Sequence, residues 1–250
     1  MNKSKLNYLL TGFPKELINK FKIDEVGMYS ITPVKDSLEY FTDIHKFIKV
    51  KNPHVLDICS SVGGDSISIG RIFGYVDSNE LDDTRYNMLK HNLSEAKKFY
   101  PFVSRTFNKD ANEFFDNKTV NENMNKGINK VYSRLPRGFY DLVYMDPPWG
   151  GENYYKEKNL KMYFGSTEVH DFINNELYKR TNYVAIKGPS NFKLDINKLN
   201  HCKLVKEYKL TISQKKGTYY KVYLLKFDYK PGETPKNSNK LEFKITKPIF

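Results

Sequence analysis

Apolar residues near the start of the chain recur at three- and four-residue steps. Residues 14–26 (PKELINKFKIDEV) and 35–49 (KDSLEYFTDIHKFIK) both follow this spacing, which places the apolar side chains on one face of an α-helix. The pattern therefore predicts two helices, one on each side of a loop at 27–33 (GMYSITP).

From residue 53 onward, short apolar runs alternate with segments of helical spacing. The run PHVLDICSSVGG predicts a strand that enters a turn of small residues, and DSISIGRIF behind it predicts a helix. A second helix is expected over 83–98, and further strands are expected at GYVDSNE, FVSRTF, FYDLVYM and NYVAIKG. This alternation predicts an α/β fold with a doubly wound, mostly parallel sheet.

The rest of the chain divides into a hairpin and two polar segments. The stretch around QKKGT predicts two antiparallel strands that close one edge of the sheet. Residues 116–134 are polar and predict a long loop or insertion. We therefore expect a helical extension at 1–50, the α/β domain at 51–228 and a tail at 229–250.

Composition narrows the class of protein. The 250 residues are 39% hydrophobic, which is enough for one domain with a core. No apolar run approaches the roughly 20 residues that span a bilayer, and the start lacks the features of a signal peptide, so an intracellular protein of the cytoplasm or nucleus is expected, with no membrane partner. The two cysteines and five histidines show no metal-ligand spacing, so we do not expect a metal site.

The formal net charge of +12 points to a polyanionic partner. Lysine and arginine side chains that neutralise phosphates release condensed counterions, which favours binding to nucleic acid. Abundant Lys, Asn, Ile, Tyr and Phe are also typical of A/T-rich genomes, so part of the lysine excess is explained by a solvated surface. Charge and aromatic content together favour nucleic acid.

Ligands of such a sheet lie beyond the carboxyl ends of the strands, where three loops carry candidate residues. Asp57 ends the first predicted strand, and Gly63 lies in the following turn, which departs from the GxGxxG dinucleotide pattern. Glu80 ends the second strand, about 20 positions on, where these folds hold a ribose; the alternative is an incidental acid in a helix cap region. Asp110 follows the third strand and fits either an adenine amino group or a helix cap.

The stretch DPPWGG, which follows the fourth predicted strand, suits methylation of an exocyclic amine on a planar base. The Asp146 side chain and the Pro147 carbonyl can accept hydrogen bonds from the amine, while Trp149, the only tryptophan, stacks on the base. The lone pair of the amine is then free to meet a methyl donor, so catalysis is mainly positioning. The alternative is a Pro-Pro turn with a structural tryptophan.

Three blocks of the sequence resemble the trimethylguanosine synthase family of RNA cap guanine-N2 methyltransferases. KFKIDEVGMYSITP matches the segment that precedes the domain, VLDICSSVGGDSISIG the cofactor loop, and MDPPWGG the catalytic loop, whose first residue is serine or aspartate in the family. The likeness runs from about residue 14 to about residue 195. In the cofactor loop, Ser61 replaces the first glycine of the family's Gly-Val-Gly-Gly run.

The resemblance implies a class I, Rossmann-like methyltransferase that uses S-adenosylmethionine and releases S-adenosylhomocysteine. The cofactor residues that it implies lie in the N-terminal block and in the loops after the strands: Tyr29, Ser30, Thr32, Asp57, Gly63, Glu80, Asp110 and Asp146. It also implies catalysis by Asp146, Pro147 and Trp149. The residues that it implies for the cap are Lys22, Trp149, Lys187 and Asn191.

The implied roles differ along the site. Lys22 would reach the phosphates of the cap, and Trp149 would stack on its methylated guanine, a cation that gains about 0.5–2 kcal/mol over an indole face. After the fifth strand, Ser190 stands where the family has a basic residue, and Lys187 or Lys193 could supply that charge instead.

Three functions remain open from the sequence. The first is a cap guanine-N2 methyltransferase acting on capped RNA as a monomer. The second is an amino-methyltransferase of adenine in DNA or RNA, for which Asp-Pro-Pro-Trp is equally natural and a duplex substrate would require base flipping. The third is a non-catalytic protein that keeps the fold to bind RNA.

Overall fold

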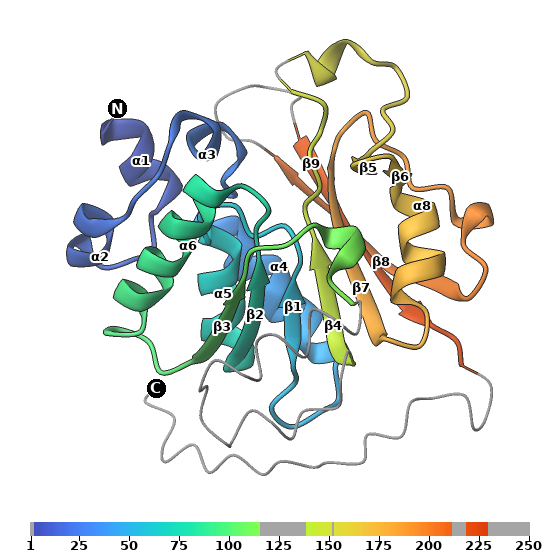
Figure 1. Ribbon diagram of the computed structural model, residues 1–250, viewed down its shortest axis with the longest axis horizontal. Helices are drawn as coiled ribbons and strands as arrows, with labels where there is room; N and C mark the ends of the chain where they lie inside the picture. Colours follow the sequence, from blue (N-terminus) through green and yellow to red (C-terminus); the bar gives the residue numbers. More distant parts are fainter. Residues whose placement is uncertain (1–2, 116–138, 152, 212–218, 230–250) are drawn as a thin grey trace.

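The computed structural model describes residues 3–115, 139–151, 153–211 and 219–229 (Figure 1). The loop expected at 116–134, the QKKGT turn and residues 230–250 of the expected tail lie outside these described residues.

A seven-stranded sheet forms the centre of the molecule, in the order β3-β2-β1-β4-β7-β9-β8. The first five strands in this order pair in parallel, β9 pairs antiparallel to β7, and β8 pairs antiparallel to β9. The predicted parallel sheet and its antiparallel edge hairpin are therefore confirmed. The strand bounds are β1 Val55–Asp57, β2 Tyr75–Asn79, β3 Val103–Phe107, β4 Tyr140–Met145, β7 Thr181–Pro189, β8 Cys202–Thr211 and β9 Tyr219–Phe227.

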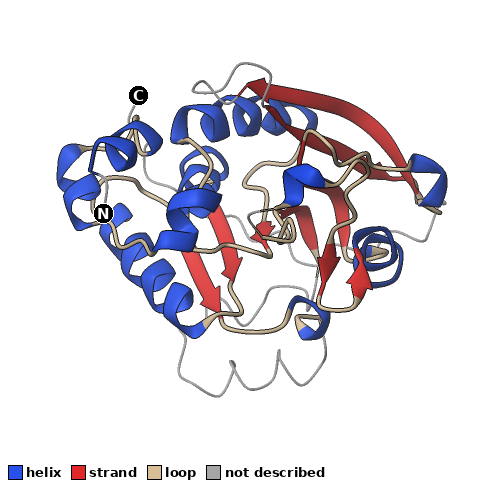
Figure 2. Cartoon of the chain, turned by 90° about the horizontal axis from the view of Figure 1, so that it is seen from above, coloured by secondary structure: helices blue, strands red, loops and turns tan. Residues whose placement is uncertain are grey.

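Helices lie on both faces of the sheet (Figure 2). One hydrophobic cluster contains the helices α1 Lys3–Leu9, α2 Lys15–Lys20, α3 Glu25–Ser30, α4 Val34–Phe47, α5 Gly64–Phe73 and α6 Asp83–Ala96. The other cluster contains shorter elements, namely η1 Ala111–Glu113, α8 Val169–Phe172 and the π-helical turn η4 Ile173–Leu177. Between β4 and β7 lie η3 Tyr154–Lys156, β5 Tyr163–Phe164 and β6 Thr167–Glu168, and η5 Ile196–Lys198 follows β7.

The N-terminal helices differ from the sequence prediction. The helix expected over 14–26 is two helices, because the backbone N–H of Lys22 donates to Asn92 Oδ1 (2.8 Å) and its carbonyl accepts from Asn92 Nδ2 (2.7 Å). The loop expected at 27–33 is wrong for 27–30, which belong to α3. Asp24 caps the start of that helix, because its Oδ1 accepts from the N–H of Gly27 (2.7 Å) and satisfies a free donor of the first turn.

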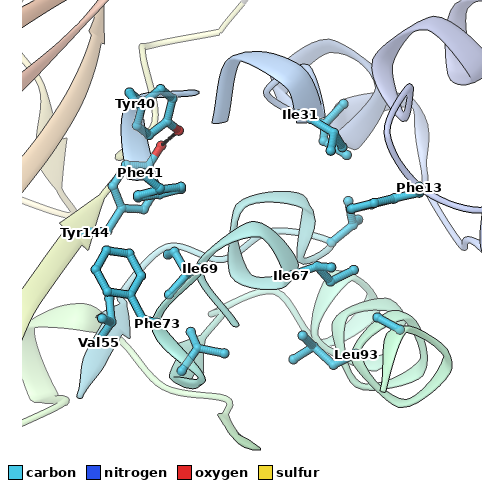
Figure 3. Packing of buried hydrophobic residues seen from close by; sticks show 14 of the residues in the cluster. Phe13, Ile31, Tyr40, Phe41, Val55, Ile67, Ile69, Phe73, Leu93 and Tyr144 are labelled. Atoms are coloured by element: carbon cyan, nitrogen blue, oxygen red, sulfur yellow. Dashed lines mark hydrogen bonds between the residues drawn. The ribbon is translucent and has the colours of Figure 1, made fainter. Parts of the chain in front are cut away.

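Aromatic side chains fix α4 and α5 against the sheet (Figure 3). Phe41 of α4 meets Tyr144 of β4 edge to face, with ring centroids 4.9 Å apart, and it meets Phe73 of α5 in the same way at 6.3 Å. The hydroxyls of Tyr40 and Tyr144 are hydrogen-bonded at 3.1 Å. These buried contacts pack α4 against β4 and against the last turn of α5.

Candidate active site

Asp57 ends β1 with its side chain fully buried. Its Oδ2 accepts from the hydroxyl of Ser66 at 2.6 Å, whereas Oδ1 has no partner among the described residues. Burial and the nearby charge of Asp65 raise the pKa of Asp57 well above its ordinary value. A buried acceptor without a hydrogen bond destabilises the folded protein, so Oδ1 is well placed to accept a hydrogen bond from a bound ligand.

The glycine turn after β1 packs tightly against two other parts of the chain. Gly63 has a φ of 93°, and a Cβ added there would lie 2.8 Å from Leu89 Cδ1 of α6. A Cβ on Gly64 would lie 2.7 Å from Ile31 Cγ1 of the N-terminal segment. No side chain caps the start of α5, so its first backbone donors are left for a ligand.

The backbone conformation of Ser61 is one that glycine adopts more easily than serine. Its φ of 47° lies in the left-handed region, which L-residues other than glycine seldom adopt. The backbone N–H of Ser61 donates to Glu80 Oε2 at 2.8 Å, and this bond supports the unusual conformation.

Glu80 joins the loops after β1 and β2 and is only 8% exposed. Besides the bond from Ser61, its Oε1 accepts from the N–H of Asp82 (3.0 Å) and lies 3.5 Å from Arg85 Nε. A carboxylate has about four acceptor positions, so these contacts leave room for a ribose hydroxyl.

Asp110 caps η1 through Oδ1, which accepts from the N–H of Asn112 at 2.8 Å. Its role in binding adenine stays a prediction.

The loop at 146–151, for which the sequence predicts catalysis and which we call the catalytic loop, is held by a buried ion pair. Asp146 Oδ2 lies 2.7 Å from Lys187 Nζ, and Oδ1 accepts from Trp149 Nε1 at 3.1 Å. The Lys187 side chain is 3% exposed, and its Nζ stands over the Trp149 ring, 5.2 Å from the centroid. Burial raises the pKa of Asp146, although Lys187 opposes this. Burial lowers the pKa of Lys187, but the charges of Asp146 and Asp65 outweigh it and raise this pKa, so Lys187 remains an ammonium.

Thr32 connects this pair to the N-terminal segment. Its hydroxyl accepts from Lys187 Nζ (2.9 Å) and donates to Asp65 Oδ2 (2.7 Å). Asp65, in the first turn of α5, also accepts from the hydroxyl of Tyr144 (2.9 Å), and the hydroxyl of Tyr40 lies 3.2 Å from its Oδ1. A continuous network therefore runs from Trp149 to the first turn of α5. We call it the Lys187 network; it consists of Trp149, Asp146, Lys187, Thr32 and Asp65.

The other residues named from the sequence are more exposed or act through the backbone. Tyr29 is 75% exposed, with Lys5 Nζ 4.3 Å from its ring centroid, and Ser30 is also exposed. The Lys22 side chain is exposed, whereas its backbone is bound to Asn92. Asn191 Nδ2 donates to the carbonyls of Tyr154 (2.8 Å) and Glu157 (2.7 Å), so it holds the segment after the catalytic loop.

Asp65 was not among the residues named from the sequence, and Lys187 was expected to face phosphates rather than Asp146. One signal was present, because Lys187 interrupts the apolar run YVAIKGP of a central strand. A charge in such a strand needs a buried partner.

Within the described ranges, no helix is long and apolar enough to cross a membrane, and no group of three His, Cys, Asp or Glu side chains could hold a metal ion.

The sheet order and the glycine turn after β1 define the class I fold of S-adenosylmethionine-dependent methyltransferases. The same fold is found in the human methyltransferase 10 domain containing protein, which is 14% identical with a TM-score of 0.51, over 91% of this chain and 96% of that chain. Residues 52–230 match the RNA cap guanine-N2 methyltransferase family, and the chain belongs to this family. The family predicted from the three sequence blocks is thereby confirmed.

Two relatives are similar over part of the sequence. An uncharacterized protein, L320, of Acanthamoeba polyphaga mimivirus is 26% identical over 148 residues, which are 59% of this chain and 50% of the relative. Trimethylguanosine synthase of Schizosaccharomyces pombe is 25% identical over 170 residues, 68% of this chain and 63% of that protein. The chain therefore spans about half to two thirds of these relatives.

The fold and the family imply S-adenosylmethionine as the methyl donor. The residues at the edge of the sheet fit this cofactor, because Asp57 offers an unpartnered buried acceptor and Glu80 a partly used carboxylate. Thr32 lies outside the matched residues 52–230, yet it touches Lys187 at the centre of the site. The N-terminal segment is thus part of the site as well as of the fold.

Proposed function

We propose that the protein transfers methyl groups to the exocyclic N2 of 7-methylguanosine in the 5′ cap of RNA. The observation that carries the proposal is Trp149, whose indole stands at the carboxyl end of β4 with its Nε1 bonded to Asp146. An indole is the best aromatic partner for a cation, and 7-methylguanine is a cationic base. Family membership points to the same substrate.

The position of Lys187 selects one face of the indole for the base. Its ammonium already stands over one face of Trp149, 5.2 Å from the ring centroid. A cationic base on that face would repel Lys187 at short range. We therefore place the methylated guanine on the opposite face of Trp149.

The catalytic loop offers acceptors for the amine that is methylated. Each carboxylate oxygen of Asp146 has one bond, to Lys187 or to Trp149, so acceptor positions remain. Asp146 and the carbonyl of Pro147 would accept hydrogen bonds from the two N–H groups of N2, which leaves the lone pair free, and the Asp146 carboxylate could take the one proton that N2 loses when the methyl group is added. The prolines have fixed φ angles and stiffen this backbone. S-adenosylmethionine, when bound, supplies an electrophilic methyl group, and alignment by these residues provides the catalysis.

A panel of acceptors tests the proposal. The protein is incubated with S-adenosylmethionine and a 7-methylguanosine cap dinucleotide, the unmethylated cap dinucleotide, or an adenine-containing oligonucleotide. We expect methyl transfer to the 7-methylated cap. Transfer to the oligonucleotide instead would favour the adenine methyltransferase, and cofactor binding without transfer to any acceptor would favour the non-catalytic RNA-binding protein.

Asp57→Ala and Glu80→Ala should each weaken S-adenosylmethionine binding about tenfold or more. Charge-assisted hydrogen bonds of about 1.5–3 kcal/mol are lost in each case. Calorimetric titration measures the affinity, and Asp83→Ala, which removes an exposed acid from the start of α6, is the matched control. Parent-like affinity in both site variants would place the cofactor elsewhere.

Lys22→Ala should weaken binding of the cap triphosphate more than binding of the 7-methylguanosine nucleoside. The reason is that its exposed side chain is assigned to phosphate, and losing one such contact lowers the salt dependence of binding by about one unit of slope. Lys15→Ala, an exposed lysine of α2, serves as control. Equal losses for the nucleotide and the nucleoside would refute the phosphate role.

A further inference from the structure

An exposed basic and aromatic surface lies beside the catalytic loop. It consists of Tyr155, Lys156, Lys158, Lys161 and Lys193, and we call it the lysine-tyrosine surface. We propose that this surface binds the single-stranded RNA that follows the cap, with Tyr155 stacking on a base and the lysines contacting phosphates. That this RNA is capped rests on the proposed function.

A row of aromatic rings leads from the catalytic loop to this surface. Trp149 meets Tyr154 edge to face, with centroids 5.2 Å apart, and Tyr154 meets Tyr155 in the same way at 6.2 Å. Gly150 and Gly151, with φ of 88° and 83°, carry the chain outward, and among the described residues other than their chain neighbours no heavy atom lies within 4 Å of a Cβ added to either. In Figure 1 the segment extends beyond the sheet at the top of the view. Among the described residues, open space therefore surrounds these two glycines, and the chain continues from them to Tyr155.

The surface is held in place by its backbone. Asn191 bonds the carbonyls of Tyr154 and Glu157, and its own carbonyl accepts from the N–H of Leu160 at 3.2 Å. Leu160 and Phe192 form an isolated parallel bridge, and both side chains are buried. The bridge brings the next residues, Lys161 and Lys193, from two segments to one place. The exposed side chains are thus displayed on an anchored backbone.

The lysines of this surface differ from many other lysines of the protein. Some exposed lysines elsewhere lie within 4.0 Å of a carboxylate, as in the pairs Lys20–Glu95, Lys46–Asp43, Lys98–Glu95, Lys203–Asp228 and Lys206–Asp43, whereas others, such as Lys15 and Lys49, have no such partner among the described residues. In the part of the chain that the structure describes, the lysines of the lysine-tyrosine surface form no such pair. Glu157, also exposed, is the one acid among the described residues 153–161. The positive charge is therefore available to an external anion.

Single-stranded RNA fits these features best. Proteins that bind single strands combine aromatic side chains, on which bases stack, with lysines that follow the phosphates. Tyr155 is 66% exposed, which offers a free ring face, and Lys156 Nζ lies 5.9 Å from its centroid. With a cap on Trp149, the row of rings Trp149, Tyr154 and Tyr155 offers the following RNA a route onto this surface.

Two variants test the proposal against a matched control. Lys156→Ala/Lys158→Ala removes two charges from the surface, and Tyr155→Ala removes the exposed ring. The control variant Lys49→Ala/Lys51→Ala removes two exposed charges from the segment before β1, at the amino ends of the parallel strands and not at their carboxyl ends. KM is measured for the cap dinucleotide and for a capped single-stranded RNA of about 20 nucleotides, long enough to cover one single-strand site.

We expect KM for the capped RNA to rise about tenfold in both surface variants and to stay unchanged for the cap dinucleotide. The salt slope for RNA should fall by about 1.4 in the double lysine variant, since each phosphate contact on a single strand contributes about 0.7. Equal changes for dinucleotide and RNA, or equal losses in the Lys49/Lys51 control, would overturn the proposal.

Binding of uncapped RNA separates this proposal from the proposed function. Fluorescence anisotropy with a labelled, uncapped single strand needs no methyl transfer. Weaker binding in the surface variants than in the control supports the surface even if caps are not methylated. Parent-like binding in the surface variants would contradict it, whatever the acceptor panel shows.

Discussion

Trp149→Ala should reduce methyl transfer to the 7-methylguanosine cap by about 100-fold or more while the protein remains folded. The substitution removes both the stacking surface, worth about 1–3 kcal/mol for a base, and the cation–π attraction of about 0.5–2 kcal/mol. The side chain is only partly buried and lies at the margin of both hydrophobic clusters, so the loss of stability should be smaller than for a core residue. Steady-state kinetics and thermal unfolding measure the two effects.

Trp149→Phe is the informative companion variant. A phenyl ring keeps a π-face with a weaker cation–π attraction, and it loses the bond from Nε1 to Asp146. We expect part of the activity to remain and the preference for 7-methylated over unmethylated caps to shrink. Cofactor affinity should barely change in either variant. A folded Trp149→Ala protein with near-parent transfer would leave DPPWGG as a structural turn.

Lys187→Met should lower the free energy of unfolding by about 3–5 kcal/mol and abolish transfer. The substitution leaves the buried carboxylate of Asp146 without its ion-pair partner, and breaking one side of a buried pair has a cost of this size. It also removes the donor to Thr32, so the N-terminal segment loses its link to the catalytic loop. Denaturant unfolding measures the stability.

Asp146→Asn/Lys187→Met distinguishes structure from catalysis. With both charges removed, the penalty for an unpaired charge disappears, so most of the lost stability should return. Transfer should stay low, because the carboxylate that accepts a hydrogen bond from the amine is gone. A double variant that regained both stability and transfer would show that the pair has no part in catalysis.

The sheet could be predicted from the sequence because its strands are short apolar runs followed by turns. The edge positions of Asp57, Glu80 and Asp146 followed from the same pattern, since parallel strands place their carboxyl ends together. The left-handed conformation of Ser61 also matches the glycine of the family at that position.

The N-terminal helices and the Lys187 network could not be predicted in this way. The break between α2 and α3 depends on Asn92, which is 70 residues beyond Lys22, and local spacing contains no trace of that contact. The bond from Lys187 to Thr32 joins residues 155 positions apart. Periodicity describes which side chains are apolar, but the partner of a buried charge is fixed only when the elements pack.

The central claim is that N2 of 7-methylguanosine receives the methyl group. After prolonged reaction of the 7-methylguanosine cap dinucleotide with S-adenosylmethionine, the product is digested to nucleosides and the methylated guanosine is measured by fragmentation mass spectrometry. We predict a mass gain of one or two methyl groups on the exocyclic nitrogen of the guanine base. A cap nucleoside of unchanged mass, from protein that binds the cofactor, would contradict the account.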